Sequence, residues 1–130
     1  MAETDIETIR ASYAALNKGD MQGALFALHR DAVWRESAEF PDGDQFEGRT
    51  AIERLLEGFL EQWDLFHQEV ESTVGKGNRV LVNIHMTAVG LESRAEVNAH
   101  YAHLWTMRDG LGVEVDAYYD PEKALRALES

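Results

Sequence analysis

The stretch Asp31–Ser37, DAVWRES, places a carboxylate close to a large aromatic ring. Its alternation predicts a β-strand with Trp34 and Glu36 on one face and with Val33 and Arg35 on the other. If the Trp34 face lines a cavity, loss of water raises the pKa of the Glu36 carboxyl toward neutrality, which suits a general acid or base. The alternative is a surface carboxylate that pairs with Arg35 or another cation.

His103 is the second residue whose position allows chemistry. It shares a predicted strand face with Tyr101 and Trp105, so it could serve a pocket as an acid, a base or a polar anchor. The alternative is a core histidine whose ring nitrogens are already hydrogen-bonded. His100 lies three positions away and therefore on the opposite face, so the two histidines are badly placed to bind one metal ion. We predict no metal site.

Large apolar side chains at helix and strand spacing could line a pocket around these two groups. Such residues more often form a plain core, but in a cone-shaped fold the core side chains also surround the cavity. The predicted lining residues are Tyr13, Trp34, Phe59, Met86, Trp105 and Tyr118. Whether Tyr118 or its neighbour Tyr119 points inward depends on whether a β-bulge precedes them.

Helices are predicted at the start of the chain, where apolar residues recur three and four positions apart. The first carries Ile6, Ile9, Tyr13 and Leu16 and ends at Gly19. Asp20 caps a short second helix whose apolar side is Ala24, Leu25 and Leu28. After a loop with the sequence EFPDGDQFEGR, Thr50 and Glu53 predict the capping box of a third helix. The apolar face of that helix runs from Ile52 to Trp63.

Beyond residue 64 the hydrophobic period changes to two, which predicts strands at 65–74, 79–89, 95–108 and 112–119. Asp109-Gly110 is the strongest hairpin signal among the turns. Pro121 begins a last helix with Leu125 and Leu128 on its buried side. The fold class is therefore α+β, a single domain spanning 1–130 in which a curved antiparallel sheet and the N-terminal helices enclose a pocket.

Composition narrows the range of partners. The chain has 130 residues, with 24 Asp and Glu against 12 Lys and Arg, a formal net charge of −12. Such a surface repels phosphate backbones and anionic lipids, so we expect neither nucleic acid nor membrane as a partner. The absence of cysteine excludes disulfides and thiol nucleophiles. The polar N-terminus has no apolar signal segment, and we expect a cytoplasmic protein.

Four stretches, in this order, resemble the NTF2-like superfamily, which includes ketosteroid isomerases and SnoaL-like polyketide cyclases. They are YAALNKGDMQGALFALHRDAVW, FEGRTAIERLLEGF, HLWTMRDG and YYDPEKALRAL. The resemblance covers nearly the whole chain. It implies an NTF2-like cone, in which the curved sheet and the N-terminal helices surround a pocket. The superfamily includes many enzymes and also non-catalytic members.

The resemblance also implies roles for individual residues. The general-base position of the isomerases falls on Glu36, one methylene longer than their aspartate. Their tyrosine donor falls on Ser12, while Tyr13 lies one residue further, about 100° around the helix. Their second donor position falls on His103. In the cyclases a histidine and an aspartate lie on the last two strands, and the corresponding pair here is His103 and Asp116.

These observations favour a cofactor-free enzyme that isomerises, cyclises or hydrolyses a small apolar substrate, with Glu36, His103 and Asp116 as catalytic residues. The alternative is a non-catalytic ligand-binding or dimerisation module of the same fold. A mixed sheet face with His85, Ala102 and Leu104 predicts a homodimer contact, since members of the superfamily commonly dimerise through the sheet.

Overall fold

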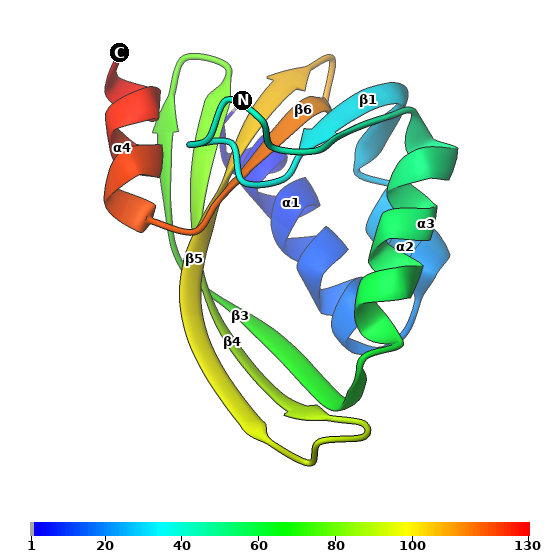
Figure 1. The fold of residues 1–130 in the computed structure, drawn as a ribbon. Coiled ribbons are helices and arrows are strands. Elements are labelled where there is room, and N and C mark those ends of the chain that lie inside the picture. Colours follow the sequence, from blue (N-terminus) through cyan, green and yellow to red (C-terminus); the bar gives the residue numbers. More distant parts are fainter. Residues whose placement is uncertain (1) are drawn as a thin grey trace.

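Residues 2–130, which the computed structural model describes, form four helices and a strongly curved six-stranded sheet (Figure 1). The helices are α1 (Ala2–Asn17), α2 (Met21–Leu25), α3 (Arg49–Leu60) and α4 (Pro121–Glu129). The strands are β1 (Leu28–Arg35), β2 (Gln45–Glu47), β3 (Trp63–Lys76), β4 (Arg79–Gly90), β5 (Glu96–Arg108) and β6 (Leu111–Tyr118). The predicted α+β class, with the N-terminal helices against a curved sheet, is confirmed.

The sheet has the order β2-β1-β6-β5-β4-β3. The meander from β3 to β6 is antiparallel, as predicted. However, β1 joins β6 in parallel, so the sheet is mixed rather than purely antiparallel. The short strand β2 pairs with β1 and lies within the segment that the sequence predicted to be a loop. Register shifts in β3 and between β5 and β6 mark bulges, which increase strand twist and bending.

The concave face of the sheet carries the main core, beneath α1, α2 and α3 (Figure 1). The predicted apolar stripe of α1 is confirmed, because Ile9, Tyr13 and Leu16 are buried. Alternate residues of β4 and β5 face the same core, with Trp105 only 2% exposed. None of the described helices is long and apolar enough to cross a bilayer.

The convex face is covered in part by α4, which packs on β4 and β5 (Figure 1). Leu81, Ala102 and Leu104 form a buried cluster there with Ala124 and Leu128 of α4. Ala102 and Leu104 are therefore wrong as homodimer contacts, since the chain's own C-terminal helix already covers them. Dimerisation itself stays a prediction.

Some element ends differ from the sequence prediction. The capping box at Thr50 and Glu53 is wrong, because α3 begins after Gly48 and no side chain caps it. Trp63 starts β3 instead of ending α3, and Leu28 starts β1 instead of ending the second helix. In α4, Leu128 is buried as predicted but Leu125 is exposed.

Gly112 provides a test of packing around Trp105. A Cβ atom at Gly112 would lie 2.7 Å from two ring carbons of Trp105, which is buried and has little room to move. We expect Gly112→Ala to lower the free energy of unfolding by about 1–3 kcal/mol, measured by urea denaturation. The control is Gly58→Ala in α3, where a Cβ meets nothing within 4 Å. It should raise stability by about 0.5–1 kcal/mol, and equal losses in both variants would contradict the packing argument.

Candidate functional site

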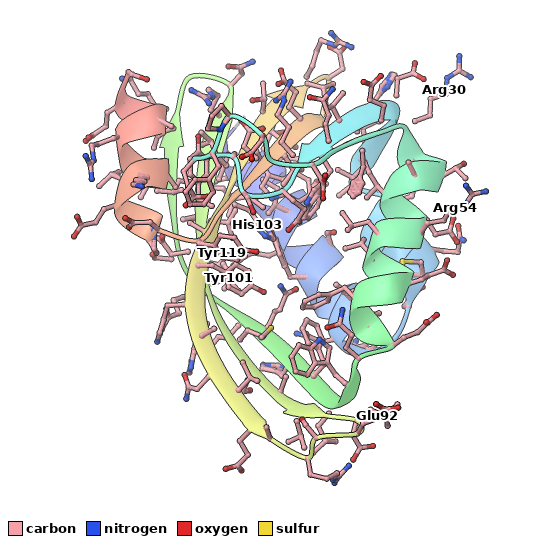
Figure 2. The ribbon with its side chains drawn as sticks, in the orientation of Figure 1. Arg30, Arg54, Glu92, Tyr101, His103 and Tyr119 are labelled. Carbon is pink, nitrogen blue, oxygen red and sulfur yellow. The ribbon has the colours of Figure 1, made fainter. Side chains whose placement is uncertain are left out.

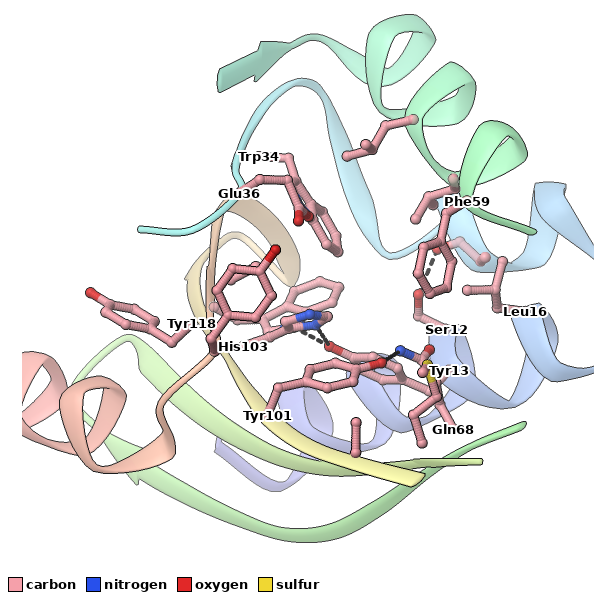
Figure 3. A pocket seen from close by; sticks show the side chains of 18 of the residues that line it. Ser12, Tyr13, Leu16, Trp34, Glu36, Phe59, Gln68, Tyr101, His103 and Tyr118 are labelled. Atoms are coloured by element: carbon pink, nitrogen blue, oxygen red, sulfur yellow. Dashed lines mark hydrogen bonds between the residues drawn. The ribbon is translucent and has the colours of Figure 1, made fainter. Parts of the chain in front are cut away.

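A cavity of about 340 Å³ opens between the concave sheet face and helices α1 and α3 (Figure 3). Its walls are largely apolar, with Leu55, Leu56 and Phe59 contributed by α3. The polar side chains that line it include Glu36, Tyr101 and His103. The prediction that Glu36 and His103 face one common cavity is confirmed.

Glu36 follows directly on the last residue of β1, and its backbone N–H donates to Asp44 O at 2.8 Å. The chain turns sharply there, with Ser37 at a positive φ of 53°. Gly43 permits the tight return, because a Cβ at that position would lie 2.4 Å from the Glu36 carbonyl oxygen. The alternation of β1 directs Trp34 inward, and Glu36, two residues later, follows it into the cavity.

The Glu36 carboxylate accepts a hydrogen bond from Trp34 Nε1 to its Oε1 at 2.5 Å. Burial raises the pKa of the Glu36 carboxyl, the indole N–H opposes that rise, and the charge of Asp44 adds to it. Arg35 points to the other face, where it pairs with Glu114 and Asp116. The alternative of a surface Glu36 paired with Arg35 is therefore wrong.

A buried chain of hydrogen bonds runs from Trp105 through Tyr13 to His103. Trp105 Nε1 can only donate, so Tyr13 Oη accepts from it at 3.0 Å. The Tyr13 hydroxyl then donates a hydrogen bond to His103 Nδ1, with 2.6 Å between Oη and Nδ1. This assigns the proton of a neutral His103 to Nε2. Within this chain the free donor is thus on His103, since the Tyr13 hydroxyl is already used.

Burial lowers the pKa of His103 to about 3, so the imidazole is neutral over the physiological range. Its Nε2 has no hydrogen-bond partner among the described residues. The atom keeps some accessible surface, since it is absent from the fully buried unpaired atoms of those residues. The Nε2–H donor is therefore open to the cavity. Trp34 and Tyr101 pack beside the ring, with centroids at 5.1 and 5.4 Å.

Gln68 and Tyr101 add a polar pair that the sequence analysis did not select. Gln68 Nε2 donates to the Tyr101 hydroxyl, and both residues line the cavity. Burial raises the pKa of Tyr101 to about 12, so its hydroxyl keeps its proton. The available signal was the position of Tyr101 on the same strand face as His103, whereas Gln68 carried no pattern of its own.

One predicted site residue, Asp116, lies outside the cavity, whereas Tyr118 borders it as predicted. Asp116 is opposite Leu104 on the convex face and binds Arg35 at 2.9 Å, so it does not pair with His103. The ring of Tyr118 packs against the cluster beneath α4, although the residue borders the cavity. Tyr119 is the tyrosine at the cavity opening, with 68% of its surface exposed. Figure 2 shows it near Tyr101 and His103.

The other predicted lining residues border the cavity as expected; they are Tyr13, Trp34, Phe59, Met86 and Trp105. One group among the described side chains has ligand atoms close enough for a metal ion, within 4.8 Å of one another; it comprises Glu69, Glu71 and His85. It lies on the convex sheet face and shares no residue with the cavity.

Comparison with known proteins agrees with this geometry. The model of the SnoaL-like domain matches residues 9–115. The chain belongs to this SnoaL-like family. Among curated proteins, none matches it in sequence.

Solved structures extend the likeness to the whole fold. TerC, co-crystallized with polyporic acid, is 24% identical with a TM-score of 0.79, covering 98% of this chain and 99% of its own. An NTF2-like protein of unknown function from Burkholderia pseudomallei K96243 is 18% identical with a TM-score of 0.79, covering 98% of both chains. A protein with a ketosteroid isomerase-like fold from Catenulispora acidiphila, in complex with trimethylamine, is 16% identical with a TM-score of 0.77, covering 88% of this chain and 85% of its own.

The buried neutral His103 should weaken the fold in acid. Below pH ~6.5 the histidine of the unfolded chain binds a proton, whereas folded His103 does not until the pH nears its pKa of about 3. Its contribution to stability therefore falls with falling pH, by at most about 1.4 kcal/mol per unit. We expect His103→Gln to remove this part of the slope in urea unfolding measured from pH 7 to pH 4. The exposed His67 supplies the control, His67→Gln, and equal slopes for all three proteins would contradict the assignment.

The contribution of Glu36 to stability changes with pH in the opposite direction to that of His103. Its folded pKa is raised, so the ionised carboxylate destabilises the fold above that pKa and ceases to do so as the pH falls through it. Glu36→Gln should be at least as stable as the parent at pH 7, and any advantage should disappear below pH ~4.5. Glu114→Gln, which removes the negative charge that pairs with Arg35 at 2.6 Å, should instead lose up to about 1 kcal/mol. Chemical denaturation at both pH values makes the comparison; a clear loss on Glu36→Gln at pH 7 would contradict the desolvation argument.

Proposed function

We propose that this chain is a cofactor-free enzyme that transfers a proton on a small apolar carbonyl compound, with Glu36 as the base. The observation that carries the proposal is the joint placement of a desolvated carboxylate and a neutral His103 N–H donor in one apolar cavity. A base with a raised pKa removes protons well near neutral pH, and a fixed donor stabilises the oxyanion that forms.

The hydrogen bonds support a separate role for each group, with Glu36 as the base and His103 as the donor to the oxyanion. Glu36 Oε1 is bound to Trp34, which leaves Oε2 to take a proton from the carbon next to the substrate carbonyl. The electrons of that C–H bond move to the carbonyl oxygen, which accepts a hydrogen bond from His103 Nε2–H. Return of the proton to a different carbon completes an isomerisation. In a cyclisation the enolate carbon instead attacks a second carbonyl of the substrate, and the alkoxide that forms takes up the proton held by Glu36.

The second candidate is a non-catalytic module that binds a small apolar molecule in the same cavity. It is favoured by the Tyr13 hydroxyl, which is used entirely within the protein and is not available to a ligand. TerC, a protein of this fold co-crystallized with polyporic acid, supports a small organic molecule as the occupant under either proposal.

Deuterium exchange into 2-tetralone separates enzyme from binding module. Its C1 protons are acidified by the carbonyl, and their loss in D₂O is followed by proton NMR. We expect the protein to accelerate exchange, with a rate that rises with pH as Glu36 ionises, through a midpoint above ~4.5. Glu36→Gln should slow the catalysed exchange by about 10²-fold or more. His103→Leu should slow it by a similar factor, because it removes the oxyanion donor.

Glu114→Gln, on the convex face, is the control for this assay and should exchange as fast as the parent. Binding of 2-tetralone without catalysed exchange would overturn the enzymatic proposal and favour the binding module.

A further inference from the structure

Gln68 presents a buried polar atom that the proposed proton transfer does not use. Its side chain is 6% exposed and lines the cavity, and its Oε1 has no partner among the described residues. Figure 3 shows Gln68 and Tyr101 on the sheet side of the cavity, apart from Glu36. A buried amide oxygen without a hydrogen bond costs free energy, so its retention in the cavity wall calls for a partner.

The Gln68 amide has one unpaired atom in either of its two orientations. With Nε2 toward Tyr101, as in the structure, Oε1 has no partner. With the amide reversed, the Tyr101 hydroxyl would donate to Oε1 and leave Nε2 unpaired. In both cases one amide atom beside the tyrosine hydroxyl is unpaired and fully buried, so a ligand group reaches it when the amide turns toward the cavity.

Gln68 is also prevented from moving away to reach another partner. Asn17, the last residue of α1, holds its backbone through two hydrogen bonds. Asn17 Nδ2 donates to Gln68 O, and Gln68 N–H donates to Asn17 Oδ1, both at 2.8 Å. These bonds fix the Gln68 backbone at the cavity wall, and the hydrogen bond to Tyr101 keeps the side chain there.

We propose that Gln68 and Tyr101 form a second polar subsite that binds a hydroxyl group of the ligand. A hydroxyl can donate and accept at once, so it satisfies the free amide atom in either orientation and also meets the Tyr101 hydroxyl. The ligand is then an apolar, ring-sized molecule with two polar ends, one at Glu36 and His103 and the other at Gln68. This inference rests on the proposed function only in taking the cavity as the binding site.

The test compares two probes, 2,6-dihydroxynaphthalene and 2-naphthol, by isothermal titration calorimetry. The diol can fill both polar positions and the mono-ol only one, so we expect the parent protein to bind the diol about tenfold more tightly. Gln68→Leu should abolish this preference by weakening binding of the diol about tenfold. Gln22→Leu, at an exposed position of α2, is the matched control and should keep the preference.

Tyr101→Phe is the second variant, needed if Gln68→Leu does not fold; it keeps the ring, and it should also lose the preference. Equal affinity of the parent for both probes, a preference that survives in these variants, or no binding of either probe would overturn the subsite and leave a bound water as the partner of Gln68. Exchange into 2-tetralone depends on Glu36 and the diol preference on Gln68, so either proposal can fail while the other stands.

Discussion

The hydroxyl of Tyr13 is the polar group on which the arrangement of the cavity depends. A phenol hydroxyl buried without partners costs several kcal/mol on the scale of ~2–7 for such groups, and Tyr13 is only 5% exposed. Its two partners, Trp105 and His103, lie on the same face of β5. The hydroxyl is satisfied only when α1 packs at one position along that strand, so this network selects a register that apolar contacts alone specify less sharply.

The same docking leaves a cavity where a core could have been filled. The rings of Trp34 and Trp105 fill the space beside Tyr13 and His103. Further along, the long strands curve away from α1, helped by the bulge in β3. Asn17 holds β3 at the end of α1, so this wall cannot collapse onto the opposite one. The hydrogen bonds between the Asn17 side chain and the Gln68 backbone thus help to keep the cavity open.

Local periodicity predicted the helices and the antiparallel meander, and together with the family resemblance it predicted the shared cavity of Glu36 and His103. It could not predict pairing between distant segments, and so the parallel contact of β1 with β6 was missed. The error at Asp116 has a simple cause, since a shift of one residue reverses the face of a strand. Asp116 lies opposite Leu104 and not His103, after a register shift next to Thr106.

The placement of α4 and the role of Gln68 were also missed, because both depend on contacts between segments far apart in the sequence. The apolar stripe of α4 indicates that one side is buried, but it does not say which sheet face will cover it. The structure places α4 on the convex face, where it covers Ala102 and Leu104. The importance of Gln68 was equally hidden, because a single glutamine within an alternating strand is unremarkable until its burial and its partners are known. The burial of Leu104 beneath α4 and of Gln68 in the cavity wall could not be predicted from the sequence pattern.

The electrostatics of the site follow from one cause acting on two groups. Loss of water raises the pKa of Glu36 and lowers that of His103, because it disfavours the charged form of each. If His103 were protonated, the nearby cation would lower the pKa of Glu36 and weaken it as a base. A neutral donor avoids this, yet still meets the negative charge that moves from the carboxylate to the substrate oxygen during proton transfer. The total charge in the cavity stays the same throughout that step, so the apolar walls have no new charge to accommodate. Burial of His103 therefore preserves the basicity of Glu36.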